Sequence, residues 1–184
     1  MFLLWAVLLG LLLGLLRHGS LANLARLKLC GLWLILVALV IQLLIFPLGS
    51  AEPLIKVGTG YLHLLSYLFL LAFIGLNWRY FEILVMGAGL ALNFVVIAAN
   101  GGYMPASAVA LRRAGLERVA AILEQGLHHG NTILMGPKTR LNFLGDIFYV
   151  PSAVPLANAF SVGDLFLALG IILFLALEMP RSRP

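Results

Sequence analysis

The sequence predicts an all-α polytopic transmembrane helical bundle, and three observations support that prediction. Of the 184 residues, 62% are hydrophobic and only 10% are charged, whereas soluble domains carry about 25% charged residues. The mean hydropathy is +1.07. The apolar residues also gather in long runs separated by short polar joints. A chain with so little polar surface needs lipid to cover it, so we expect a single integral membrane domain over residues 1–184.

Five apolar runs have the length and composition expected of membrane spans. The first, residues 2–16, is short, but Arg17 and His18 extend it by snorkelling outward. No positive charge precedes this run and no A-x-A site follows it, which favours a retained helix over a cleaved signal peptide. The remaining predicted spans are residues 29–48, 54–76, 81–99 and 161–179.

A long connection, residues 100–160, precedes the last span and holds most of the polar residues of the chain. Within it, apolar residues recur at i, i+3, i+4, i+7 and i+11, a spacing typical of an amphipathic helix. These residues are Leu116, Val119, Ala120, Leu123 and Leu127. Beside a membrane, such a helix is expected to lie in the interface. The alternative is a helix packed on the loops of its own protein.

The net charge of +5 suits lipid headgroups, because the basic residues cluster beside apolar runs; no nucleic-acid partner is expected. Six lysines and arginines fall on each side of a five-span arrangement. Short loops and the first helix weigh more in setting orientation. We therefore expect the basic hinge of Arg17, Arg26 and Lys28 to be cytoplasmic, together with the C-terminus and its Arg181 and Arg183. The connection then lies outside.

Two short motifs in the connection are candidate binding elements. Asn-Gly-Gly-Tyr-Met-Pro at 100–105 either forms a tight exit from the fourth span or presents its backbone to a polar ligand group. His128 and His129 are adjacent, so they do not share a helix face, and no metal site or cofactor is expected there. The candidate binding residues are Asn100, Gly101, Gly102, Tyr103, Pro105, His128 and His129.

Two carboxylates, Asp146 and Asp164, lie in apolar sequence, where charge is costly and often functional. If they face each other, they can share a proton and support general acid and base catalysis on water. The structural alternative is capping. Ser161-x-x-Asp164 matches a capping box at the start of the last helix, and Asp146 is suited to begin a short helical turn.

Three residues within or beside the spans carry simpler expectations. His63, in the third span, is expected to bond to a neighbouring helix, with a proton relay as the alternative. Asn93, in the fourth span, is also expected to bond to a neighbouring helix. Cys30, the single cysteine, is expected to be a small buried residue.

The motifs at 100–105, 144–148 (Leu-Gly-Asp-Ile-Phe) and 160–165 (Phe-Ser-Val-Gly-Asp-Leu) together carry a family resemblance. The chain resembles a family of small bacterial membrane proteins that is catalogued only as a domain of unknown function. The resemblance covers about the last 85 residues by motif and the rest by hydropathy. It implies a location in the bacterial inner membrane.

Residues 158–164, Asn-Ala-Phe-Ser-Val-Gly-Asp, are similar to the end of lipoprotein signal peptidases, whose last helix opens with Phe-Asn-x-Ala-Asp. Those enzymes are small helical bundles with an aspartate dyad, and the match would make Asp164 catalytic. Ser161 and Gly163 depart from that pattern. The Asn-x-x-Asp-Arg motif of the other aspartate is missing, so the resemblance assigns no role to Asp146.

Three functions remain open from the sequence. The first is a non-catalytic accessory or binding protein that uses the 100–160 connection for a small molecule or a partner. The second is an aspartate-dependent membrane hydrolase that uses Asp146 and Asp164, and the third is a small transporter. The expected partners are the lipid bilayer and either another membrane protein or a second copy of this chain. Glycines in several spans suit such self-association.

Overall fold

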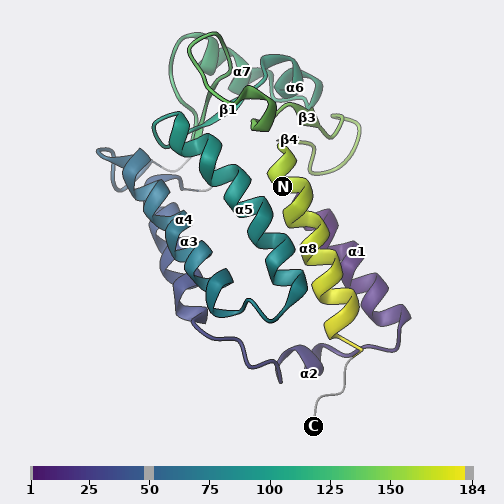
Figure 1. Cartoon of the computed structure of the whole chain (residues 1–184). Helices are drawn as coiled ribbons and strands as arrows, with labels where there is room; N and C mark the ends of the chain where they lie inside the picture. Colours follow the sequence, from purple (N-terminus) through teal and green to yellow (C-terminus); the bar gives the residue numbers. More distant parts are fainter. Residues whose placement is uncertain (1, 48–51, 181–184) are drawn as a thin grey trace.

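The computed structural model describes residues 2–47 and 52–180, and most of them are helical. Five longer helices form the body of the molecule, and the short elements lie at its two ends (Figure 1). The longer helices are α1 (Leu3–Leu16), α3 (Leu32–Ile45), α4 (Thr59–Leu76), α5 (Phe81–Ala99) and α8 (Val162–Glu178). The short helices are α2 (Leu21–Leu24), α6 (Ala108–Arg113), α7 (Glu117–Glu124) and the 3₁₀ turn η1 (Asn142–Leu144).

The five longer helices pack in the spatial order α3, α4, α5, α8, α1 (Figure 1). Small residues permit the close crossings between these helices. A Cβ atom added to Gly10 of α1 would lie 2.9 Å from a side-chain carbon of Leu175 on α8. Gly89 of α5 and Gly163 of α8 likewise meet backbone against backbone. Glycine thus sets the spacing of the α1–α8 and α5–α8 pairs.

Two helices, α4 and α5, are long and apolar enough to cross a membrane, judged by length and composition. Helix length and composition therefore do not support the predicted number of five spans. Helices α1 and α3 have 14 residues each, and 14 residues rise about 21 Å against a hydrocarbon thickness of about 30 Å.

The predicted spans 29–48 and 54–76 begin several residues before the helices α3 and α4 that the structure shows. Gly31 and Gly58 adopt left-handed φ angles of 73° and 70° directly before α3 and α4. Each therefore delays its helix by several residues. Leu48, the predicted end of the second span, lies outside the described residues, as do Arg181 and Arg183.

The connection folds over one end of the bundle as a small cap (Figure 1). Strand β1 (Met104–Ala106) pairs in parallel with β2 (Thr132–Leu134), and β3 (Phe148–Tyr149) pairs antiparallel with β4 (Ala159–Phe160). These pairings give the connection a fixed structure. They were not predicted, because two- and three-residue strands carry no detectable hydrophobic periodicity.

The amphipathic helix of the connection is present as α7, shorter than predicted. Its apolar face is covered by protein, because Ala120 and Leu123 are fully buried. They form a core with α6 and the strands that includes Ala106, Leu111 and Ala159. The prediction of an interfacial helix with that face in lipid was therefore wrong. The alternative, packing on the protein's own loops, is what the structure shows.

Candidate ligand cavity between the bundle and the connection

A cavity of about 470 Å³ lies where the connection covers the helix ends. Helices α4, α5 and α8 line it from the bundle, and α6, α7 and the strand segments line it from the cap. Its polar lining residues are Tyr67, Asn93, His129, Asn131, Thr132, Asp146, Asn158 and Asp164. Both aspartates identified from the sequence therefore face one space, although they are 18 positions apart in the chain.

Asp164 is held by the capping box predicted at the start of α8. Its backbone N–H donates to Ser161 Oγ (3.1 Å), and its Oδ2 accepts from the Ser161 N–H (3.0 Å). Asn93 extends this box, because its Nδ2 donates to Asp164 Oδ1 (3.0 Å) and its Oδ1 accepts from Ser161 Oγ (2.8 Å). The expected bond from Asn93 to a neighbouring helix is thereby confirmed. The four bonds lock one edge of the cavity.

Asp146 reaches the cavity by a different route. It does not begin a helical turn, as was expected, but forms a parallel bridge with Ala106 at the end of β1. Its N–H donates to the Pro105 carbonyl (2.9 Å), and its own carbonyl accepts from the Ser107 N–H (3.0 Å). The N–H and carbonyl groups of Asp146 bond to the segment around β1, so they are not available for the hydrogen bonds of a helical turn. The backbone of Asp146 is thus fixed, while no described residue donates a hydrogen bond to its carboxylate.

The two aspartates differ in electrostatic environment. Burial, and to a smaller extent the nearby carboxylate of Asp164, together raise the pKa of Asp146 to about 7. Asp146 can therefore hold or release a proton near neutral pH. A carboxyl group in this state can accept a hydrogen bond or a cationic group when ionised and donate a hydrogen bond when protonated.

The Asn-Gly-Gly motif packs against α4. Gly102 has a φ of 96°, and a Cβ atom there would overlap the Cα atom of Gly60. Nδ1 of His63, one turn further along α4, donates to the Gly102 carbonyl (2.7 Å). His63 therefore does bond across elements, although its partner is the connection and not a helix. Gly60 and Gly102 thus allow the connection to pack closely on the N-terminal end of α4.

The other candidate binding residues lie at different distances from the cavity. His129 lines it, whereas the His128 ring lies tilted against the Tyr103 ring, with 5.1 Å between ring centroids. The Tyr103 hydroxyl bonds to Thr59 Oγ1 (2.6 Å). Asn100 holds the Arg140 backbone. Pro105 sits in β1 and Gly101 lies beside Gly102. The structure therefore places one of these seven residues, His129, at the cavity.

Sequence reasoning missed several lining residues. Tyr67 was detectable, because it lies four residues after His63 on α4 and so shares its face. Asn131 and Asn158 carried no such signal, since irregular backbone positions them. No group of three histidine, cysteine or carboxylate side chains suited to a metal gathers within residues 2–47 and 52–180.

Comparison with known proteins identifies a family for this architecture. No curated protein and no solved structure matches the chain. The family model described as "Family of unknown function (DUF5317)" matches residues 26–176. That range extends beyond the motifs of the connection to include α3, α4 and α5. Of the two resemblances seen in the sequence, the comparisons show only the one to a family of unknown function. The chain therefore belongs to the DUF5317 family.

Proposed function

We propose that this protein crosses a bacterial inner membrane with all five longer helices and binds a small molecule in the cavity beneath the connection. The first part is supported by large apolar side chains that point outward from every longer helix. Leu12, Leu36, Leu68, Leu84 and Leu169 are 44% to 62% exposed, one from each helix. Lipid would cover this surface. Local thinning of the bilayer and snorkelling of flanking residues would accommodate the shorter α1 and α3.

The proposed orientation places the basic hinge in the cytoplasm and the connection outside. Cys30 provides a direct test because it is the single cysteine and is exposed at the hinge end, contrary to the expectation of a buried residue. A membrane-impermeant maleimide should label it only after cells are lysed. A Cys30→Ser/Lys138→Cys variant, with its thiol in the connection, should be labelled in intact spheroplasts. The reverse pattern would refute this orientation.

The binding proposal rests on one observation: two carboxylates line a single cavity that has no lysine or arginine among its described lining residues. The basic side chain present is His129, which is exposed. Apolar groups, among them Phe46 and Leu111, line the rest. A cavity with this lining favours a ligand that joins an ammonium group to an apolar body.

Octylamine is a suitable first probe, with octanoate as the matched anion. Thermal unfolding in detergent should show stabilisation by octylamine at pH 8 and none by octanoate. Asp146→Asn should remove the effect, because it takes away the carboxylate that has no described protein donor. Glu117→Gln, an exposed carboxylate on α7, is the matched control. Equal responses in the two variants would mean that the cavity does not recognise the amine.

A second candidate, an aspartate-dependent hydrolase, is favoured by the same pair of carboxylates. In that chemistry one carboxylate takes a proton from water as the water oxygen attacks an ester or amide carbonyl. The other carboxyl group gives a proton to the leaving oxygen or nitrogen. A fluorogenic lipopeptide is the probe. Asp146→Asn should slow its cleavage by about 100-fold or more, and Glu117→Gln should not. Absence of cleavage by the unmodified protein would leave the binding function alone.

A further inference from the structure

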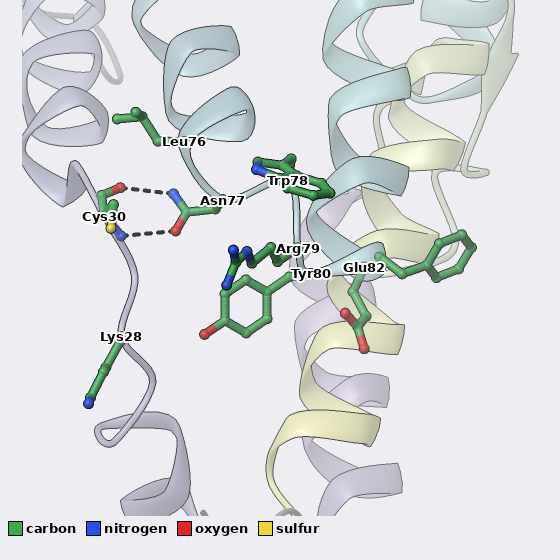
Figure 2. Close-up of a pocket in the computed structure, with 9 residues that line it drawn as sticks. Lys28, Cys30, Leu76, Asn77, Trp78, Arg79, Tyr80 and Glu82 are labelled. Atoms are coloured by element: carbon green, nitrogen blue, oxygen red, sulfur yellow. Dashed lines mark hydrogen bonds between the residues drawn. The ribbon is translucent and has the colours of Figure 1, made fainter.

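A second pocket, of about 550 Å³, is drawn in Figure 2. Its residues lie at the α4–α5 joint, at the opposite end of the bundle from the connection (Figure 1). It forms where α4 ends and α5 begins, beside the hinge segment that leads into α3. The residues that define its character are Lys28, Asn77, Trp78, Arg79, Tyr80 and Glu82. None of these residues lines the ligand cavity.

Asn77 fixes the shape of this pocket. Its Oδ1 accepts from the Cys30 N–H (2.9 Å), and its Nδ2 donates to the Cys30 carbonyl (2.8 Å) (Figure 2). The same Nδ2 also donates to the Phe73 carbonyl (2.8 Å). A single buried side chain thus ties the hinge segment to the end of α4. The tie holds Lys28 on the hinge beside the joint that carries Arg79.

The charged groups of the pocket are arranged asymmetrically. Lys28 and Arg79 are both exposed, and neither forms an ion pair with any described residue. Arg79 lies 5.8 Å from the centroid of the Trp78 ring, within cation–π range. Glu82 is only 3% exposed, and Figure 2 shows its carboxylate on the far side of Tyr80 from Lys28. The lining of the pocket therefore includes two exposed cations, one from the hinge segment and one from the joint, and no exposed carboxylate among its described residues.

The surroundings of the pocket are those of a membrane boundary. Leu76, Trp78 and Phe81 are 56%, 63% and 66% exposed around it. Tryptophan and tyrosine gather at headgroup depth because their rings are amphipathic. Arginine and lysine between helices on the cytoplasmic side are the groups that hold anionic headgroups. The pocket thus combines cations, aromatic rings and a joint between helices at one depth.

We infer that this pocket binds the phosphate of an anionic phospholipid headgroup between Lys28 and Arg79. Asn77 holds the segment that carries Lys28 against the joint that carries Arg79. This inference rests on the proposed membrane embedding but not on the ligand of the cavity. Two cations at a membrane surface each favour an anionic lipid by about fivefold, so the pair gives about a 25-fold preference over a zwitterionic lipid.

The test uses the full chain with Trp5→Phe and Trp33→Phe, which leaves Trp78 as the single tryptophan. The protein is reconstituted into phosphatidylcholine nanodiscs that contain a minority of lipid brominated near the headgroup. Brominated phosphatidylglycerol should quench Trp78 at about 25-fold lower mole fraction than brominated phosphatidylcholine. Adding Lys28→Gln and Arg79→Gln should bring the two lipids to parity.

Arg118→Gln/Lys138→Gln is the matched control, because it removes two exposed positive charges from the connection. The preference for phosphatidylglycerol should survive in this control. Equal loss in both double variants, or no preference in the starting protein, would overturn the inference. Displacement of the lipid by inorganic phosphate, at an ionic strength matched with chloride, would also overturn it in favour of a free anion. Carbonate extraction of the protein from membranes would instead refute the membrane embedding itself.

Discussion

The two ends of the bundle carry opposite charges in opposite settings. At the covered end, Asp146 and Asp164 face a cavity beneath the cap. At the hinge end, Lys28 and Arg79 are exposed at the pocket beside the joint between α4 and α5. The folded connection places Asp146, and the capping box of α8 together with Asn93 places Asp164. At the hinge end, Asn77 ties the segment that carries Lys28 to the joint that carries Arg79.

The charged side chains at the two ends are thus accommodated differently, by hydrogen-bond donors at one end and by exposure at the other. A partly buried carboxylate needs protein donors or a proton, and Asn93 and Ser161 supply donors to Asp164. Lys28 and Arg79 have long apolar stems and are exposed, and under the proposed membrane embedding they would reach the headgroups without such donors. The covered end is therefore expected to be sensitive to substitutions that disturb packing and hydrogen bonds. The hinge end is expected to respond mainly through lipid binding.

The largest effect is expected where the cap meets α4. Gly102→Ala places a methyl group against Gly60 at a φ of 96°, so we expect a loss of about 3 kcal/mol or more. Gly101→Ala is the control, since Gly101 has a φ of 69° but no neighbour within 4 Å. It should cost about 1 kcal/mol. Thermal unfolding in detergent measures both. Equal losses would show that backbone strain and not the contact with α4 dominates.

Removal of Asn93 should have the next largest effect. Asn93→Ala takes one donor from Asp164 and one acceptor from Ser161 in a buried setting. We expect a loss of about 2 to 3 kcal/mol. Asn131→Ala, at another polar residue of the cavity lining, should cost under about 1 kcal/mol. A similar loss at both positions would mean that the capping network contributes nothing special.

Asp146→Asn should stabilise the protein above pH 7. Burial and Asp164 raise the Asp146 pKa to about 7, so the folded state binds a proton that the unfolded state releases near pH 4. The protonated Asp146 therefore does not destabilise the folded state below about pH 4. Between about pH 4 and pH 7 the free energy of unfolding falls, because the folded state must keep a proton that the unfolded state has released. The variant should gain about 1 to 2 kcal/mol at pH 8 after allowance for partial exposure, and almost nothing at pH 4. A gain that did not depend on pH would contradict this account.

The smallest change in stability is expected at the hinge end. Asn77→Ala should cost only about 1 kcal/mol, because the hydrogen bonds from Asn77 to the Cys30 backbone are only partly buried. The preference for phosphatidylglycerol should nevertheless fall toward that of the Lys28→Gln/Arg79→Gln variant. An unchanged lipid preference would show that Lys28 and Arg79 do not depend on this tie.

Local sequence predicted the elements that depend on near neighbours. The Ser161-x-x-Asp164 capping box is an i,i+3 arrangement, and the structure confirms both of its hydrogen bonds. The fourth apolar run, 81–99, matches α5 to the residue. The predicted starts of α3 and α4 were less accurate, because the left-handed φ angles of Gly31 and Gly58 cannot be read from hydropathy.

The sequence by itself determined that this chain forms apolar helices, a capping box and one amphipathic helix, because each depends on residues within a few positions. Only the tertiary structure decided that Asp146 joins Asp164 in one cavity, since a parallel bridge to Ala106 carries it there. The same is true of Asn77, whose partner Cys30 lies 47 positions away. Pairings of this kind depend on how the helices and the cap close around one another, and no local pattern in the chain specifies that closure.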